Sequence, residues 1–273
     1  MKYYEFNNAP GKPLINLAYA NGFPPQTYHE ALKPLFDRYH VVALAERPLW
    51  GDCPPESIHA WQQFGDDLLD GLASLTDQPI IGIGHSFGGV ATTYAAIKRP
   101  ERFSRLVLID PTFLPPHWLL AAWLTRRLGI RLRQGLIDGA LRRRRTWDST
   151  EVAYEYFRSK RLFARSSDAV VRAYAESITA PGDDGSVHLV WTPEWEAQIY
   201  RTLATDVWTL PRRIKQPLMV LRGEASDTFL KSSAALFHLL NPRANMIDVS
   251  GAGHLVPQDQ PEQVGKLIAE FLG

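Results

Sequence analysis

Short runs of apolar residues alternate with longer amphipathic segments along most of the chain. Six apolar runs, bounded by Pro, Gly or polar residues, cover 14–18, 41–44, 80–83, 106–109, 218–222 and 246–249. Runs of this length that are rich in β-branched residues and Leu are typical of strands buried on both faces of a parallel sheet. Helix-length segments occur at 26–38, 57–75, 88–98, 228–240 and 261–272. This alternation predicts an α/β fold, with a mostly parallel sheet covered by helices.

The segment 57–75 has the clearest helical periodicity. Its apolar residues recur every three or four positions, as at Ile58, Trp61, Phe64 and Leu68, which predicts one buried helix face. Ser57 precedes this pattern and is the predicted N-cap of the helix.

The region 111–211 interrupts the alternation of strands and helices. It contains no convincing buried strand, several amphipathic helical segments and six of the eight tryptophans, namely Trp118, Trp123, Trp147, Trp191, Trp195 and Trp208. A structureless connection of this length would be unusual in a compact domain. We therefore predict a helical cap at 111–211, inserted into a core formed by 1–110 and 212–273.

The composition is that of an ordinary globular protein. The 273 residues are 45% hydrophobic and 22% charged, and the net charge of +1 provides no basic field for nucleic acid. The only cysteine is Cys53, which excludes an internal disulfide and an all-cysteine zinc site. No apolar run reaches the ~18 residues of a membrane span, and the first residues do not resemble a signal peptide. A cytoplasmic protein is expected.

The strongest chemical signal is the pattern G-x-S-x-G at Gly84-His85-Ser86-Phe87-Gly88. It follows a predicted strand and precedes a predicted helix, which is the context of a nucleophile elbow. In such an elbow a tight turn holds the serine in a strained conformation with its hydroxyl accessible, and small neighbours make room for the turn. A glycine-rich turn with a capping serine is the simpler interpretation. The flanking strand and helix favour Ser86 as a nucleophile.

A serine hydroxyl needs a base, and His254 is the best placed of the eight histidines. It follows the run 246–249 on a loop of small residues and precedes the helix that Pro261 begins. His85 adjoins Ser86 in sequence, but its side chain should point away from the site, and we interpret it as structural. The other six histidines are expected to be surface or core residues.

A carboxylate should complete the set by fixing the tautomer of the histidine. Asp227, on the loop after strand 218–222, gives the chain order Ser, Asp, His and is the preferred candidate. Asp110, directly after strand 106–109, is the alternative, with a turn cap before Pro111 as its simpler role. Glu224 is a weaker third candidate because it lies closer to the end of its strand.

Two backbone amides should bind the oxyanion of the reaction. One is the amide of Phe87, the residue after the nucleophile. The other is predicted to be the amide of Phe23, after the turn Asn21-Gly22, with Gly22 permitting a sharp bend that leaves this amide facing the site.

Together these motifs resemble the α/β-hydrolase-fold serine hydrolases with a helical cap, across essentially the full chain. The resemblance implies acyl transfer to water, with Ser86 as nucleophile, His254 as base, no metal and no organic cofactor. It also implies that relatives with an aspartate nucleophile, such as epoxide hydrolases and haloalkane dehalogenases, are poorer matches. Many members have His-Gly where this chain has Asn21-Gly22. Many also have Asp-x-Arg-Gly-x-Gly where this chain keeps only Arg47 and Gly51.

Several alternatives stay open on the sequence alone. The same residues serve C–C bond hydrolases, thioesterases, lactonases and acyltransferases, and a ligand-binding protein without turnover is a further possibility. The stretch 111–145 contains eight arginines and one acid, a net charge of +7. Arg126, Arg127, Arg131, Arg133 and Arg142 to Arg145 form either a solvated face, which base rates favour, or a patch for a membrane surface or anionic ligand. The substrate is expected to be a small molecule, and the sequence does not indicate an oligomeric state.

Overall fold

The computed structural model describes residues 2–129 and 135–273 and is built around a seven-stranded sheet. The strand order is β1-β3-β2-β4-β5-β9-β10, and every neighbouring pair is parallel except β1 with β3. The strands are β1 (Tyr3–Glu5), β2 (Leu14–Ala18), β3 (His40–Leu44), β4 (Ile80–His85), β5 (Phe103–Ile109), β9 (Leu218–Gly223) and β10 (Asn245–Val249). All six predicted strands are present. The short edge strand β1 was not predicted.

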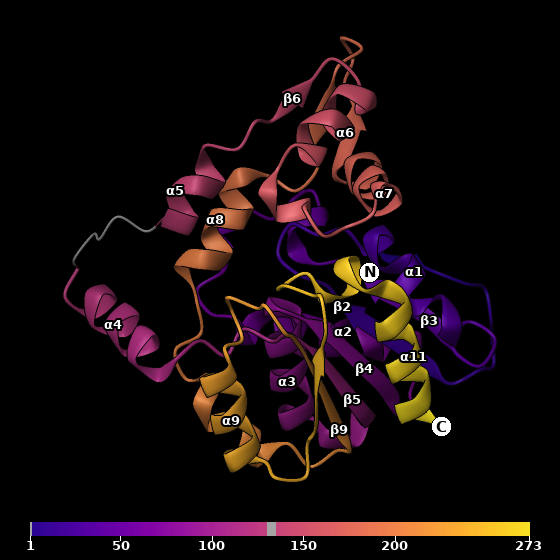
Figure 1. The fold of residues 1–273 in the computed structure, drawn as a ribbon, viewed down its shortest axis with the longest axis vertical. Coiled ribbons are helices and arrows are strands. Elements are labelled where there is room, and N and C mark those ends of the chain that lie inside the picture. Colours follow the sequence, from indigo (N-terminus) through magenta and orange to yellow (C-terminus); the bar gives the residue numbers. More distant parts are fainter. Residues whose placement is uncertain (1, 130–134) are drawn as a thin grey trace.

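Helices cover both sides of the sheet, as the alternation predicts. In Figure 1, α3 lies to one side of the strands and α11 to the other. The helices that belong to the core are α1 (His29–Leu32), α2 (Gln62–Leu75), α3 (Phe87–Lys98), α9 (Lys231–Leu240), α10 (Val256–Asp259) and α11 (Pro261–Leu272). α2 packs against α3, and α1 packs against α11.

Two predicted helices differ from the observed ones. The segment 26–38 contains the 3-10 turn Pro25–Tyr28, the short helix α1 and a second 3-10 turn at Lys33–Leu35. Pro34 lacks an amide hydrogen and prevents one continuous helix there. α2 begins at Gln62, so Ser57 is not its N-cap; the Ser57 hydroxyl donates instead to the carbonyl of Pro54 (2.7 Å).

Residues 111–211 enter after β5 and return to β9, its parallel neighbour in the sheet. This insertion contains the helices α4 (Pro116–Arg127), α5 (Gly135–Leu141), α6 (Thr150–Arg158), α7 (Asp168–Ile178) and α8 (Pro193–Arg201). It also contains a small antiparallel sheet of order β6-β8-β7, formed by Thr146–Trp147, Val187–Leu189 and Thr179–Pro181. The insertion is thus mainly helical, as expected, and the small sheet is an addition that the sequence did not predict. Strands of two or three residues are too short to show the apolar alternation of a longer strand.

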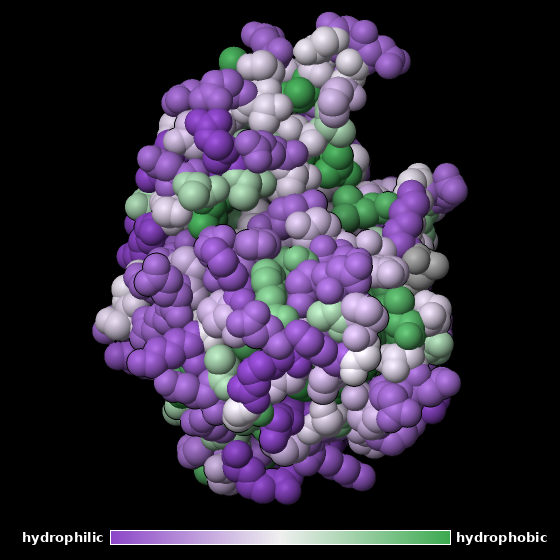
Figure 2. Space-filling model, turned by 90° about the vertical axis from the view of Figure 1, so that its right-hand side faces the viewer, coloured by the Kyte–Doolittle hydropathy of each residue, from purple (hydrophilic) through white to green (hydrophobic). Residues whose placement is uncertain are grey.

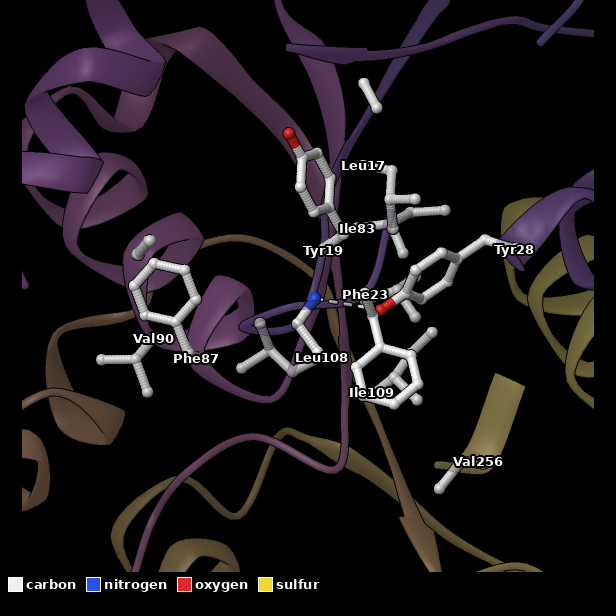
Figure 3. Close-up of a cluster of buried hydrophobic side chains, with 14 of the residues drawn as sticks. Leu17, Tyr19, Phe23, Tyr28, Ile83, Phe87, Val90, Leu108, Ile109 and Val256 are labelled. Atoms are coloured by element: carbon white, nitrogen blue, oxygen red, sulfur yellow. Dashed lines mark hydrogen bonds between the residues drawn. The ribbon is translucent and has the colours of Figure 1, made fainter. Parts of the chain in front are cut away.

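The main core lies between the sheet and its helices and continues up to the turn after β2. Leu17, Ile83 and Leu108 come from three adjacent strands and are fully buried. Figure 3 shows these side chains packed around Phe23 and Phe87, the two residues predicted to supply oxyanion amides. The core therefore supports directly the loops at the carboxyl end of the sheet.

The side of the molecule that lies at the right in Figure 1 is largely polar. In Figure 2, which presents the right-hand side of Figure 1, hydrophilic residues predominate and hydrophobic ones form small patches. None of the helices in the described ranges is long and apolar enough to cross a membrane.

Candidate active site

Ser86 lies in the tight turn between β4 and α3, as predicted. Its backbone has φ 56° and ψ −122°, which is an unfavourable conformation for a residue with a side chain. The amide of Ser86 donates to the carbonyl of Ile109 on β5 (2.9 Å), and its carbonyl accepts from Gly89 (3.1 Å). These bonds hold the strained turn in place. The side chain is therefore fixed at the carboxyl end of the sheet.

The glycine at position 88 allows this turn to sit against the end of β2. A Cβ atom placed on Gly88 would lie 2.3 Å from the carbonyl oxygen of Ala18, far inside van der Waals contact. The start of α3 can therefore approach β2 only if this residue is glycine.

His254 accepts a hydrogen bond from the hydroxyl of Ser86. Its Nε2 atom lies 2.8 Å from the Ser86 Oγ atom, and its side chain is 23% exposed. The loop that carries His254 is anchored by Asp259, whose carboxylate accepts from the amide of Gly253 (2.9 Å). Burial raises the pKa of the Asp259 carboxyl.

Asp110 is the carboxylate that contacts His254. Its Oδ2 atom lies 2.6 Å from His254 Nδ1 and also accepts from the Ser226 hydroxyl (2.6 Å), while Oδ1 accepts from the amide of Gly223 (2.9 Å). Asp110 is fully buried and has φ 41°. Among the described residues, only Ser86 and Asp110 combine a side chain with a positive φ. Backbone strain of this kind is concentrated at functional sites.

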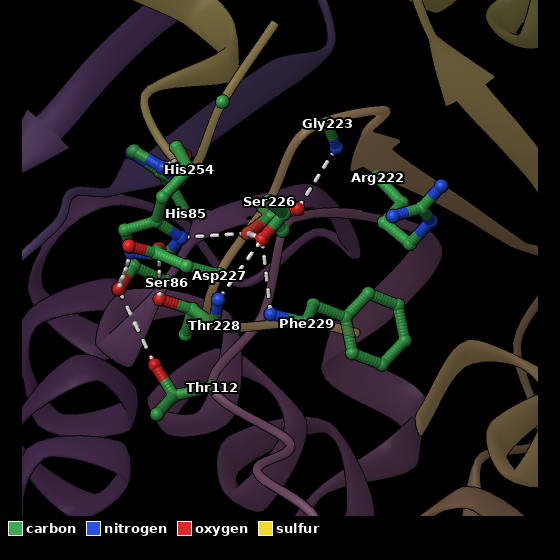
Figure 4. A network of polar contacts seen from close by, with 12 residues as sticks. His85, Ser86, Thr112, Arg222, Gly223, Ser226, Asp227, Thr228, Phe229 and His254 are labelled. Carbon is green, nitrogen blue, oxygen red and sulfur yellow. Dashed lines mark hydrogen bonds and ion pairs between the residues drawn. The ribbon is translucent and has the colours of Figure 1, made fainter. Parts of the chain in front are cut away.

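The preference for Asp227 is corrected by this geometry. β4 pairs with β5 so that His85 lies beside Ile109, and the next residues, Ser86 and Asp110, are therefore neighbours at the sheet edge. Asp227 lies on the turn after β9 and is exposed; its Oδ1 atom accepts from Thr228 (3.4 Å). Ser226 and Asp227 are neighbours on this turn (Figure 4), and it is the Ser226 hydroxyl that donates to Asp110.

Glu224, the third candidate acid, also lies apart from His254. Its carboxylate is exposed and accepts from the Ser250 hydroxyl (2.9 Å) and the amide of Gly251 (3.3 Å). The hydrogen bond from Ser250 holds the pKa of this carboxyl below its usual value.

His85 is structural, as the sequence indicates, and it supports the His254 loop. Its Nε2 atom donates to the carbonyl of His254 (2.9 Å), so Nδ1 is the acceptor of the Tyr28 hydroxyl (2.8 Å). The same hydroxyl accepts from the amide of Ala20 (2.9 Å). Burial lowers the pKa of His85 to about 3, which keeps the ring neutral at physiological pH. One hydrogen-bonded chain thus connects the turn after β2, the end of β4 next to Ser86, and the His254 loop.

The two predicted oxyanion amides differ in their surroundings. Phe87 is the first residue of α3, where an amide has no acceptor within its own helix. The amide of Phe23 instead donates to the carbonyl of Ala20 (3.0 Å), closing a turn in which Gly22 has φ 75°. The bend at Gly22 is as expected, but the amide of Phe23 is not left free, and an oxyanion would have to compete for it.

Asn21, which stands where the resemblance leads one to expect histidine, connects this turn to the insertion. Its side-chain carbonyl accepts from the indole of Trp191 (3.1 Å), and its amide donates to the backbone carbonyl of Glu196 (3.2 Å). The departure from the family pattern therefore has a structural role.

No group of three or more His, Cys, Asp or Glu residues in the described ranges is arranged to hold a metal ion. Cys53 contacts the hydroxyl of Ser57 (3.1 Å) and lies outside the Ser86 network.

A family model described as "Alpha/beta hydrolase family" matches residues 18–267, nearly the whole chain. The chain belongs to the alpha/beta hydrolase family. It is an enzyme of the hydrolase class, with the fold of that family.

Similar proteins with curated names are distant in sequence. The alpha/beta hydrolase described here is 27% identical to a 2-(acetamidomethylene)succinate hydrolase of Mesorhizobium japonicum over 87% of this chain and 80% of that protein. It is also 27% identical to the AB hydrolase superfamily protein YfhM of Bacillus subtilis, over 95% of this chain and 90% of that protein.

Solved structures confirm the fold at low identity. A crystal structure of E-2-(acetamidomethylene)succinate hydrolase has a TM-score of 0.80 at 22% identity and covers 99% of this chain and 94% of its own. A thioesterase domain from the curacin biosynthetic pathway has a TM-score of 0.71 at 18% identity and covers 98% of this chain and 93% of its own.

Three polar residues of this alpha/beta hydrolase were missed by the sequence reasoning. Ser226 donates to Asp110, Tyr28 donates to His85, and the Thr112 hydroxyl lies 3.3 Å from that of Ser86. Thr112 follows Asp110 closely in sequence, which is a usable signal. Ser226 and Tyr28 carry no motif that distinguishes them from other polar residues.

Proposed function

We propose that this hydrolase cleaves an ester-like bond of a small, apolar substrate through an acyl-enzyme on Ser86. The observation that carries the proposal is the continuous pair of hydrogen bonds Ser86–His254–Asp110, at 2.8 and 2.6 Å. A hydroxyl of ordinary pKa attacks a carbonyl efficiently only when a base takes its proton, and the unprotonated Nε2 atom of His254 lies within reach.

In the acylation half of the reaction, Ser86 attacks the carbonyl carbon and its proton passes to His254. Asp110 holds the imidazole in the correct tautomer and stabilises the imidazolium that forms. The amide of Phe87 donates to the developing oxyanion, with the amide of Phe23 as the second donor once its turn opens toward the substrate. His254 then protonates the departing alcohol.

In the deacylation half, His254 removes a proton from water as the water attacks the acyl-enzyme. Collapse of the second tetrahedral intermediate returns the proton to Ser86 and releases the acid. The reaction consumes one water molecule for each ester bond cleaved, and it needs no metal or organic cofactor.

Aromatic side chains of the insertion support an apolar substrate. The ring of Phe23 contacts Tyr174 (5.1 Å between centroids) and Phe163 (6.0 Å), both from the insertion. These three rings are buried and make the packing under the oxyanion turn apolar. Apolar surroundings of this kind favour an apolar acyl or alcohol moiety. The apolar contacts near the oxyanion turn come from these Phe and Tyr residues. Of the six tryptophans in the insertion, Trp191 contacts Asn21 of this turn.

A substrate panel tests the proposal. p-Nitrophenyl esters of increasing acyl length, thioesters, lactones and amides are assayed with the wild type and with Ser86→Ala. We expect kcat/KM to rise from acetate to medium-chain esters, by up to about 0.8 kcal/mol per buried CH₂. A flat or falling series would contradict the apolar substrate. Preferential turnover of thioesters, lactones or amides would replace the ester assignment.

Covalent labelling distinguishes an enzyme from a ligand-binding protein without turnover. A fluorophosphonate probe should label wild-type Ser86 and leave Ser86→Ala unlabelled. Absence of labelling in the wild type would contradict the nucleophile assignment, whatever the natural substrate.

A further inference from the structure

Helix α4 presents its apolar side to solvent. Leu120, Leu124 and Leu128 follow one another at four-residue intervals along one stripe, and they are 56%, 42% and 66% exposed. Leu119 is the only buried residue of this helix. A helix on a globular protein ordinarily buries such a stripe, whereas α4 leaves it exposed.

Two tryptophans of α4 are exposed as well. Trp118 and Trp123 are 46% and 48% exposed. α4 lies at the left edge of Figure 1, apart from the sheet. A groove of about 480 Å³ under the helix is lined by Leu119, Trp123 and Trp208, among others. Adjacent exposed apolar side chains in such numbers mark an interaction surface.

The charge around α4 indicates what covers it. No acidic residue occurs from 111 to 137, whereas Arg126 and Arg127 end the helix. Arg126 is bonded to the carbonyl of Leu203 (2.7 Å) and anchors the helix to the body of the protein. Arg127 is exposed and forms no ion pair within the described ranges. Arg131 and Arg133 lie outside the described residues and play no part in the inference.

We propose that α4 docks this hydrolase onto an anionic lipid surface. The leucine stripe enters the boundary between headgroups and acyl chains, Trp118 and Trp123 lie at the level of the headgroups, and Arg127 meets lipid phosphate. This is the arrangement of an interfacial amphipathic helix. The sequence alone favoured a solvated arginine face. In the structure Arg127 lies three residues after Leu124 and seven after Leu120, so it shares the exposed side of α4 with the leucines.

A second copy of the chain fits this surface less well. A two-fold dimer brings the same patch of each subunit together, and the patch contributes arginine without a carboxylate to pair with it. The nearest acid, Asp206 in the groove, already accepts from Tyr94 and from Gln62 (3.0 Å). Lipid phosphate supplies the missing negative charge.

Cosedimentation with vesicles tests the proposal. We expect the wild type to bind vesicles of phosphatidylcholine with phosphatidylglycerol at least tenfold more tightly than vesicles of phosphatidylcholine alone, and less tightly in 1 M salt. The variant Leu120→Gln/Leu124→Gln should lower this binding at least tenfold. Leu239→Gln is the matched control, because Leu239 is a 73% exposed leucine on α9, and it should bind as the wild type does.

Two further variants separate charge from apolar contact. Arg127→Gln should weaken binding to anionic vesicles about fivefold, which corresponds to about 1 kcal/mol for one arginine near an anionic surface. The tryptophan emission of the wild type should shift to shorter wavelength on binding. Trp118→Phe/Trp123→Phe should remove most of that shift.

Three results would overturn the proposal. These are equal binding to both kinds of vesicle, binding that Leu120→Gln/Leu124→Gln leaves unchanged, and a lipid-free dimer that this variant dissociates. The last would show that a second copy covers α4. The substituted leucines are exposed, so the variant should keep the wild-type Tm and its turnover of a water-soluble ester, which checks that it is folded.

Discussion

Replacing Asp110 by Asn tests the central assignment of the site, because it exchanges a charged acceptor for a group of the same shape. Oδ2 of Asp110 accepts from both His254 and Ser226, and Oδ1 accepts from Gly223. In the variant, an amide nitrogen at the Oδ2 position faces two donors. His254 can adapt only by shifting its proton to Nε2, where the proton blocks acceptance from Ser86.

The size of the effect follows from this geometry. The wrong tautomer should lower kcat by about 10⁴, as in other triads, which equals about 5.4 kcal/mol at 1.36 kcal/mol per tenfold change. The opposite amide orientation restores an acceptor to His254 but leaves the buried amide of Gly223 facing a donor. An unpaired buried donor costs about 1–3 kcal/mol of folding stability. Asp110→Asn should therefore lose activity, stability or both.

Asp227→Asn is the matched control. Asp227 is exposed and, among the described residues, its carboxylate accepts a hydrogen bond only from Thr228. We therefore expect kcat/KM within twofold of the wild type and an unchanged Tm. The assay combines ester turnover, the rate of fluorophosphonate labelling and thermal unfolding. The reasoning is refuted if Asp110→Asn keeps activity within tenfold while Asp227→Asn loses a hundredfold or more.

Three further predictions follow from the same geometry. Ser86→Ala and His254→Ala should each lower kcat by about 10⁶ in the ester assay without lowering Tm; activity within tenfold of the wild type in either would contradict its role. The pKa of His85 is about 3 in the folded protein and 6.5 in a model peptide, so the unfolded chain binds the extra proton between these values. The contribution of neutral His85 to the unfolding free energy should be fully present above pH 6.5 and fall by up to about 1.4 kcal/mol per pH unit toward pH 3. His85→Gln should reduce this pH dependence in denaturant titrations. Equal slopes in the wild type and the variant would exclude His85 as the source. Gly88→Ala places a Cβ 2.3 Å from a backbone oxygen of β2 and should lower the unfolding free energy by roughly 1–3 kcal/mol. Gly139→Ala, with no atom within 4 Å, should not destabilise α5. Equal unfolding free energies of the two variants would show that β2 moves to accommodate the added Cβ.

The sequence predicts the core fold and two of the three central site residues because each has a local signal. Ser86 is marked by the glycines on both sides of it, and the structure shows why, since the elbow packs directly on β2. His254 is marked by a loop of small residues between a strand and a helix. Both signals lie within a few residues of the side chain they identify.

The acid could not be decided in the same way, because its position depends on the pairing of strands. Asp110 and Asp227 both follow a buried strand, and the chain order Ser, acid, His fits either of them. Only the register of β4 against β5 places Asp110 beside Ser86. On the turn after β9, Ser226 faces inward and its neighbour Asp227 faces outward. That alternation has no signature in the composition of the loop.

The insertion was the least predictable part for a related reason. The strands of its small sheet have two or three residues each, which is too few for an apolar pattern to emerge. The leucine stripe of α4 has a clear helical period, but the period does not tell which side faces the protein. Helical spacing was therefore informative about secondary structure and uninformative about burial.

The turn after β2 explains why a departure from the family pattern is compatible with an organised site. From the core side, the amide of Ala20 donates to Tyr28, which donates to His85, which in turn donates to the carbonyl of His254. From the opposite side, Asn21 is held by Trp191 and Glu196 of the insertion. These contacts hold the turn in the form in which the amide of Phe23 donates to Ala20, so the proposed oxyanion role of Phe23 requires this turn to open. Through Asn21 the insertion therefore contacts the turn that carries Phe23 directly. We expect substitutions in the insertion to change the position of the Phe23 amide more than that of the Ser86 hydroxyl.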